Sequence, residues 1–198
     1  MKKIRITLLS IVTLSCLLIN VASVFAATPS AVGKFTKGVS NTTVYIDYGT
    51  GANYWQTYIT RGASNWESPG WYNPINITFV SSTYGSSIDV YANPGDLWAD
   101  EGTVVYAETQ HFNQGKQINT NYDSDNWTYS EVWINDREFR SPSFTNEDAL
   151  ATLIHEYGHA FGLLHDDYNG YSIMAPGYSR KVYRVQQVDN DAIVQKYS

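Results

Sequence analysis

Cysteine is almost absent from this sequence of 198 residues, which contains only Cys16. Because Cys16 lies in the N-terminal apolar stretch, the rest of the chain cannot form an internal disulfide bond, and packing or a bound metal must stabilise it. Positive charge is also scarce, since 13 Lys and Arg residues face 19 Asp and Glu residues, a formal net charge of −6. This balance argues against nucleic acids and anionic membranes as partners, because both require basic patches.

The first 26 residues have the pattern of a secretory signal peptide. Lys2, Lys3 and Arg5 precede a mostly apolar run over residues 6–21, and small residues end at Ala26 as at a cleavage site. A transmembrane anchor or a lipid-modified Cys16 fits less well, because the apolar run is interrupted and continues past the cysteine. Cleavage would remove 26 of the 198 residues, with three cations and no anion, and would leave 172 residues with a charge of −9. We therefore predict a secreted, extracellular monomer without stable membrane association.

Hydrophobic patterning predicts an α+β fold for the remainder. Residues 27–41 are small, polar and aperiodic, so we expect a flexible tail or a short pro-segment before a single domain over residues 42–198. Alternating or β-rich stretches predict five strands, over residues 43–47, 76–81, 87–92, 102–108 and 131–136. Apolar residues three to four apart predict helices over residues 51–66, from residue 145 onward and over residues 188–197. Residues 110–130 are polar and indicate a loop with weak extended pieces. Most predicted strands come early in the chain and two of the long helices come last, an order that favours an α+β architecture.

The strongest chemical signal is a cluster of histidines late in the chain. Three of the four histidines occur within residues 155–165, in the arrangement His-Glu-x-x-His-x-x-Gly-x-x-His. On a helix, His155 and His159 lie on one face. Gly162 can then end the helix in a left-handed conformation, which would bring His165 to the same point. Three imidazoles and one open position are the ligand set typical of a catalytic zinc ion.

Neighbouring residues support this interpretation. Thr145-Asn146-Glu147-Asp148 is a capping-box pattern directly before the apolar run, so the histidine motif has its own helix start. Gly158 costs a helix about 1 kcal/mol relative to alanine, which the helix either tolerates as strain or accepts because another segment packs closely there. Met174 is the only methionine apart from Met1, and it follows His165 by nine residues.

This constellation resembles the metzincin clan of zinc endopeptidases, with residues 155–165 as its zinc-binding motif and Met174 in its Met turn. Residues 172–178, Ser-Ile-Met-Ala-Pro-Gly-Tyr, are most similar to the matrixin family, peptidase family M10. The resemblance implies a metzincin catalytic domain over residues 42–198. It also implies a twisted, mostly parallel five-stranded sheet with one antiparallel edge strand, an active-site helix and a small C-terminal subdomain.

The same resemblance implies a role for each site residue. His155, His159 and His165 would bind one catalytic zinc ion, and Glu156 would act as general base and then general acid on a zinc-activated water. Met174 and Pro176 would support the site as the Met turn. The predicted strand over residues 102–108 resembles the matrixin edge strand, on which protein or peptide substrates bind in extended form. Its candidate contact residues are Val104, Val105, Tyr106 and Ala107.

The sequence departs from the matrixin pattern in three respects. Only His111 remains outside the motif, so we expect no second, structural zinc and interpret His111 as a solvent-exposed loop residue. No cysteine is available for the latency switch of matrixin pro-domains, so control of activity must differ or be absent. Calcium is typical of the family and is a further candidate ion, although no candidate ligand has a convincing loop spacing. These candidates are Asp89, Asp96, Asp123, Asp125 and Asp167.

Other classes of function stay open alongside the endopeptidase. The chain contains 7 Phe, 6 Trp and 16 Tyr residues, and exposed rings could bind carbohydrate or protein in a secreted binding module with a non-catalytic metal site. Ordinary burial of these rings is the simpler explanation. A catalytically inactive relative used for binding is a third alternative, which the intact Glu156 disfavours.

Overall fold

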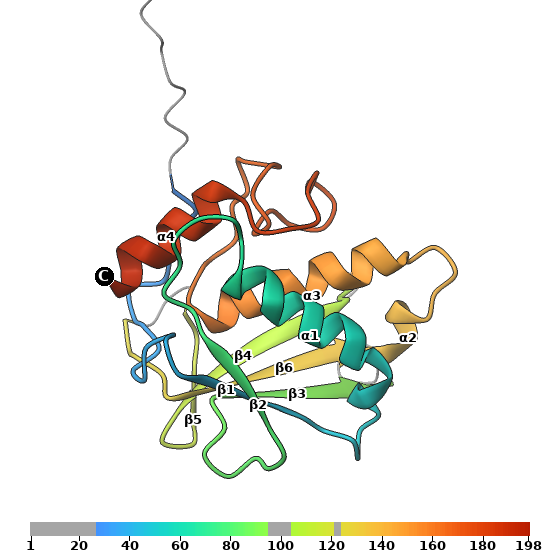
Figure 1. The fold of residues 1–198 in the computed structure, drawn as a ribbon. Helices are drawn as coiled ribbons and strands as arrows, with labels where there is room; N and C mark the ends of the chain where they lie inside the picture. Colours follow the sequence, from blue (N-terminus) through green and yellow to red (C-terminus); the bar gives the residue numbers. More distant parts are fainter. Residues whose placement is uncertain (1–26, 95–103, 121–123) are drawn as a thin grey trace, which may run out of the picture.

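A six-stranded sheet forms the centre of the computed structural model, which describes residues 27–94, 104–120 and 124–198 (Figure 1). Its order is β2-β1-β3-β6-β4-β5. The strands are β1 (Thr42–Ile46), β2 (Ile77–Val80), β3 (Ile88–Asn93), β4 (Ala107–Asn113), β5 (Lys116–Ile118) and β6 (Tyr129–Asn135). Neighbouring strands from β2 to β6 are parallel, whereas β4 is antiparallel to both β6 and β5. The predicted signal peptide lies outside the described residues.

The antiparallel end of the sheet corrects the sequence prediction. We predicted a strand over residues 102–108 and a loop over residues 110–130, but β4 runs to Asn113 and turns directly into β5. The chain reverses at Gln114 and Gly115, whose φ angles of 51° and 79° are those that a two-residue hairpin turn requires. The sheet therefore has six strands instead of the predicted five, while the mostly parallel α+β architecture is confirmed.

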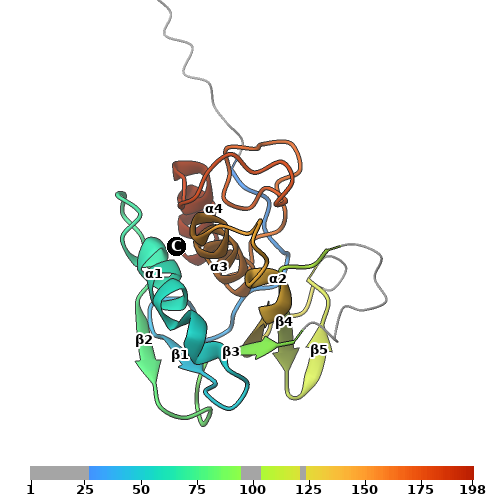
Figure 2. The same cartoon turned by 90° about the vertical axis from the view of Figure 1, so that its right-hand side faces the viewer.

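Two long helices cover one face of the sheet. The helices α1 (Gln56–Glu67) and α3 (Asn146–Ala160) lie side by side over this face (Figures 1 and 2). The first is preceded by the 3-10 turn η1 (Ala52–Trp55) and buries Ile59, Ala63 and Trp66, as the apolar spacing predicts. The indole of Trp66 donates a hydrogen bond to the carbonyl of Ile154 at 2.8 Å. This contact fixes α3 relative to α1 and so positions the histidine motif.

Two further helices complete the fold. α2 (Asp136–Phe139) follows β6 directly and was not predicted, whereas α4 (Gln187–Tyr197) confirms the predicted closing helix. Between α3 and α4 the chain forms the loops of the C-terminal subdomain, above α3 in Figure 1. Within the described residues, no helix has the length and apolar character needed to cross a membrane.

Residues 27–41 are packed against the domain, which corrects the expectation of a flexible tail. Ser30 forms a β-bridge with Leu163, and Phe35 forms one with Trp127. The side chain of Phe35 is buried. From α4, Nζ of Lys196 donates hydrogen bonds to the carbonyl of Ala31 at 2.7 Å and to a second carbonyl, that of Gly33. The boundaries 27–41 and 42–198, and removal of the segment, stay predictions.

The face of the sheet away from the helices contains one of the candidate calcium ligands. The buried carboxylate of Asp89 accepts hydrogen bonds from the hydroxyls of Tyr91 at 3.1 Å, Tyr129 at 2.8 Å and Ser86. Its oxygens therefore already have protein donors. Asp96 and Asp123 lie outside the described residues. In the part of the chain that the structure describes, the cluster of side chains that could hold a metal ion consists of histidines and contains none of the candidate aspartates, so calcium is not supported.

Candidate metal centre

The helix that presents the histidines begins where the capping box predicts. The hydroxyl of Thr145 accepts a hydrogen bond from the main-chain N–H of Asp148 at 3.1 Å, and the Asp148 carboxylate accepts one from the N–H of Thr145 at 3.0 Å. These reciprocal bonds satisfy main-chain donors that the first helical turn would otherwise leave without partners. The start of α3 is therefore fixed by local sequence, and the faces of its later turns follow from it.

The end of α3 turns the chain back toward the same face. Gly162 has φ of 89°, in the left-handed region that favours glycine. The N–H of Leu163 donates to the carbonyl of Gly158 at 2.9 Å, and the N–H of Gly162 donates to that of His159 at 2.7 Å. This pair of bonds is the Schellman motif, which ends a helix and reverses its direction. It confirms the predicted turn and brings His165 to the other two histidines.

The three imidazoles converge on one point. Nε2 of His155 lies 3.0 Å from Nε2 of His159 and 3.2 Å from Nε2 of His165. Nδ1 of His155 and Nδ1 of His159 each lie 2.8 Å from a main-chain carbonyl, those of Ile173 and Leu163. These carbonyls can only accept, so each Nδ1 carries the proton and each Nε2 presents a lone pair to the shared point.

This arrangement fits a zinc ion. Lone pairs that face one another repel, and a cation between them removes the repulsion. Tetrahedral ligands at zinc–nitrogen distances of 2.0–2.1 Å lie roughly 3.3 Å apart, close to the observed separations. The candidate ligand atoms of the three residues all lie within 4.8 Å of one another. Main-chain acceptors behind two imidazoles are also the outer hydrogen bonds that orient histidine ligands.

The surroundings of the three histidines favour the neutral form that binds metal, with His155 buried, His159 half-buried and His165 exposed. Burial lowers the pKa of His155 well below its ordinary value and lowers that of His159 to about 4. The pKa of His165 is also lowered, again chiefly by burial. Because protons do not compete for these nitrogens at neutral pH, the site is ready to accept a divalent cation.

Glu156 lies beside the histidines with its carboxylate almost enclosed. Its residue is 5% exposed, and Oε2 accepts a hydrogen bond from the hydroxyl of Thr109 on β4 at 2.7 Å. The same hydroxyl lies 3.0 Å from the main-chain carbonyl of Glu156. Burial raises the pKa of Glu156 to about 7, although the bond from Thr109 opposes the rise. A carboxyl group with this pKa can both take up and release a proton near neutral pH.

The predicted Met turn lies directly behind the histidines. Met174 is fully buried, and Ile173, the residue before it, supplies the carbonyl that orients His155. The turn is held by Asp189 of α4, whose Oδ2 accepts from the N–H of Ile173 at 3.0 Å and whose Oδ1 accepts from the hydroxyl of Ser172. Pro176 lines a cleft beside the histidines, and its support of the site stays a prediction.

Two clefts meet at the histidines. One, of about 590 Å³, runs along β4 and β5, and the other, of about 650 Å³, lies between residues 104–107 and the C-terminal loops. Both are lined by Ala107, Glu156 and His165. The other predicted substrate-contact residues, Val104, Val105 and Tyr106, precede β4 and line the second cleft. Their contact with substrate stays a prediction.

Sequence reasoning placed His111 wrongly and missed two residues of the site. His111 is not exposed in a loop but is 4% exposed on β4, with Nδ1 3.0 Å from the hydroxyl of Ser130. It does not belong to the histidine triad. No sequence pattern indicated a role for Thr109, because its partner Glu156 is distant in sequence. A sequence signal existed for Asp189, which lies at the third helical position of a second capping box, after the N-cap residue Gln186.

Comparison with known proteins agrees with this geometry. The family model for Matrixin, peptidase M10, matches residues 65–198, which include the last turn of α1, α3, the three histidines, the Met turn and α4. No curated protein matches the chain. The match covers more than half of the 198 residues and contains the whole histidine motif. The chain therefore belongs to the matrixin family of metalloproteases.

Proposed function

We propose that this chain is a secreted zinc endopeptidase that hydrolyses peptide bonds in extracellular proteins, with Glu156 as its general base and acid. One observation carries the proposal: the buried carboxylate of Glu156 and the imidazole of His165 line both clefts, while His155 lines one and His159 the other. Three neutral ligands, one proton carrier and a groove beside them are the components that zinc-assisted hydrolysis requires.

Each residue has a distinct task in this reaction. His155, His159 and His165 would hold the zinc ion, which would supply Lewis acidity for the scissile carbonyl and the attacking water. Ionised Glu156 accepts a proton from that water and delivers it to the leaving amine. Thr109 holds Oε2 of Glu156 through its hydroxyl, so the carboxylate keeps one orientation during both transfers. The carbonyls of Ile173 and Leu163 keep the imidazoles of His155 and His159 aimed at the ion.

The decisive experiment compares Glu156→Ala with the zinc-loaded wild type. We expect both to bind about one zinc per chain, measured by elemental analysis, because Glu156 is not a ligand. Casein cleavage should fall by about 10²–10⁴-fold in the variant, since a positioned general base contributes that much. The matched control is Glu147→Ala, which removes an exposed acid in the first turn of the same helix. Cleavage by Glu156→Ala at the rate of the control would exclude Glu156 as the base.

Secretion is tested separately from catalysis. The N-terminal residues with their cations, apolar run and small residues before Ala27 support cleavage after Ala26. Mass spectrometry of the protein recovered from the medium should give the mass of residues 27–198, and light scattering should give that of a monomer. Retention of the full chain in the cell membrane would contradict the secretory part of the proposal.

The alternative of an aromatic binding module receives little support from the positions of the rings. Trp66 and Trp127 are fully buried, and Trp133 stacks on Tyr91 with ring centroids 4.6 Å apart. Trp98 lies outside the described residues. A chelator distinguishes the two functions, because it should abolish casein cleavage until zinc is restored. Carbohydrate binding that persists in the chelator, without cleavage in its absence, would favour the binding module.

A further inference from the structure

The second cleft beside the histidines has mostly apolar walls. On one side lie Val104, Val105 and Tyr106, and the ring of Tyr106 stacks on that of Phe144 with centroids 4.6 Å apart. On the other side lies the C-terminal loop with Pro176. His155, Glu156 and His165 close the end of the cleft at the metal centre. A side chain close to the scissile bond is therefore the part of a substrate that would enter it.

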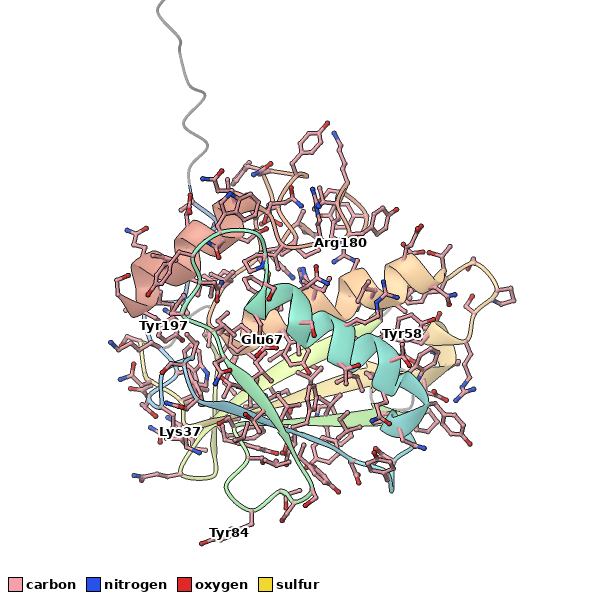
Figure 3. All side chains as sticks on the ribbon, viewed as in Figure 1. Lys37, Tyr58, Glu67, Tyr84, Arg180 and Tyr197 are labelled. Carbon is pink, nitrogen blue, oxygen red and sulfur yellow. The ribbon has the colours of Figure 1, made fainter. Side chains whose placement is uncertain are left out.

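Arg180 places a cation in this apolar cleft. It comes from the C-terminal loop above α3 (Figure 3) and is partly buried. The loop fixes its main chain on both sides, since the N–H of Arg180 donates to the carbonyl of Pro176 at 2.9 Å and the N–H of Lys181 donates to that of Gly170 at 2.7 Å. These bonds fix the main chain at Arg180, whose side chain lines the cleft.

Among the residues that the structure describes, the side-chain donors of Arg180 have only one weak hydrogen-bond partner. Nη2 lies 3.4 Å from the hydroxyl of Thr152 on α3, which is a long hydrogen bond. Neither of the two ion pairs in the described residues includes Arg180; they join Arg137 to Glu138 and Arg140 to Asp136. A guanidinium has five N–H donors in a planar fork that matches a carboxylate. The guanidinium of Arg180 can therefore bind a carboxylate of a substrate.

Two acidic groups act on Arg180 from further away, but both have other partners. Asp148 lines the same cleft, and its Oδ2 accepts bonds from the N–H and the hydroxyl of Thr145 in the capping box. Glu156 accepts its bond from Thr109. Neither carboxylate lies within ion-pair distance of Arg180. They reduce the positive potential in the cleft without occupying the fork.

We propose that Arg180 is a specificity-determining residue, and that this cleft selects substrates with an aspartate or glutamate side chain next to the scissile bond. The inference rests on the proposed endopeptidase function and narrows its substrate class. The apolar walls exclude water around the carboxylate and strengthen its charge-assisted hydrogen bonds to the guanidinium. Preference for an acidic side chain over its neutral amide should therefore be about tenfold or more.

The first test uses a proteome-derived peptide mixture and zinc-loaded wild type, with cut sites read by mass spectrometry. Aspartate and glutamate should be enriched at one position within two residues of the cut. Pairs of fluorogenic peptides with Glu or Gln at that position should then differ in kcat/KM by about tenfold. In Arg180→Gln the ratio should fall toward one. The matched control is Lys181→Gln, which removes the neighbouring exposed cation and should keep the ratio of the wild type.

The second test measures binding alone and separates this inference from the proposed function. The Glu156→Ala variant, which should not cleave, is titrated with the same labelled Glu and Gln peptides by fluorescence anisotropy. The Glu peptide should bind about tenfold more tightly, and adding Arg180→Gln should remove the difference. If the wild type cleaves nothing, the endopeptidase proposal fails, but this titration still decides the role of Arg180. Equal binding of both peptides, or a preference that survives Arg180→Gln, would overturn the inference, and the wild-type comparison suffices if that variant does not fold.

Discussion

The sulfur of Met174 lies directly against the bare main chain of Gly158, one residue before the zinc-site His159. A Cβ atom built on Gly158 would overlap Sδ of Met174 and would lie 3.1 Å from Cζ2 of Trp66. The glycine predicted to allow close packing therefore does so, and its partner is the Met turn. The contact joins α3 to the turn whose Ile173 carbonyl orients His155.

Gly158→Ala should consequently destabilise the protein in spite of the better helix propensity of alanine. Relief of the overlap must displace either α3 or the Met turn, and overpacking of this kind costs about 1–3 kcal/mol. We expect a lower free energy of unfolding in urea and weaker zinc binding in a competition titration with a chelator. Gly177→Ala is the control, because a Cβ there meets no atom within 4 Å. Unchanged stability and zinc affinity in Gly158→Ala would show that the Met turn does not restrain the helix.

Thr109→Val should shift the pH dependence of catalysis. The hydroxyl of Thr109 stabilises ionised Glu156, so its loss raises the pKa of that carboxyl group. Bound zinc favours ionisation, so we expect the acid limb of kcat/KM in the wild type at or below a pKa of about 7. In the variant the limb should move to higher pH, with a several-fold loss of kcat/KM on the acid side and little loss on the alkaline plateau. Thr109→Ser, which keeps the hydroxyl, should restore the wild-type profile. A uniform loss at every pH would instead indicate a purely structural role.

In the metal-free protein, Glu156 should make the free energy of unfolding depend on pH. Its pKa rises from 4.5 to about 7 on folding, so between these values the folded chain holds a proton that the unfolded chain has released. This contribution is fully present below pH 4.5 and is lost as pH rises through 7. Glu156→Gln lacks this contribution. The free energy of unfolding of the wild type, minus that of the variant, should therefore fall with rising pH, by at most about 1.4 kcal/mol per pH unit.

Urea unfolding in a chelator at several pH values between 4.5 and 8 measures this difference. The buried histidines favour folding as pH rises through their ordinary pKa of 6.5, the opposite direction, but both proteins contain them and their effect cancels. A difference that stays constant with pH would mean that Glu156 is ionised in the folded, metal-free protein.

Asp189→Asn should destabilise the Met turn and weaken metal binding at the histidines. Oδ2 of Asp189 accepts main-chain bonds from Ile173 and Gln186, and Oδ1 accepts from the hydroxyls of Ser172 and Thr28. An amide replaces one of these acceptor oxygens with a donor, which leaves buried groups without partners at a cost of about 2–4 kcal/mol. Thermal unfolding should occur several degrees lower, and zinc should dissociate faster. Asp191→Asn, an exposed acid on the same helix, should change neither property. Equal behaviour of the two variants would exclude Asp189 as the anchor of the turn.

Local sequence determined the parts of this protein that depend on short-range geometry. The capping box at Thr145, the four-residue spacing of His155 and His159, and the left-handed turn at Gly162 each involve neighbours in the chain. Helix periodicity and main-chain sterics fix such features before any long-range contact forms. For this reason the metal-binding face of α3 and the return of the chain to it could be read from residues 145–165.

Tertiary structure determined which distant residues contact the histidine motif and the cleft beside it. Thr109 reaches Glu156 across 47 positions of sequence, and Arg180 reaches Thr152 across 28. Neither pairing has a periodicity that a sequence pattern could reveal, because the β4–β5 hairpin and the C-terminal loop are placed by packing on the sheet and on α3. The burial that raises the pKa of Glu156 and encloses His111 is likewise a property of the assembled core. The sequence alone therefore determined a helix that presents candidate metal ligands, and only the fold supplied the partner of Glu156 and the cation in the cleft.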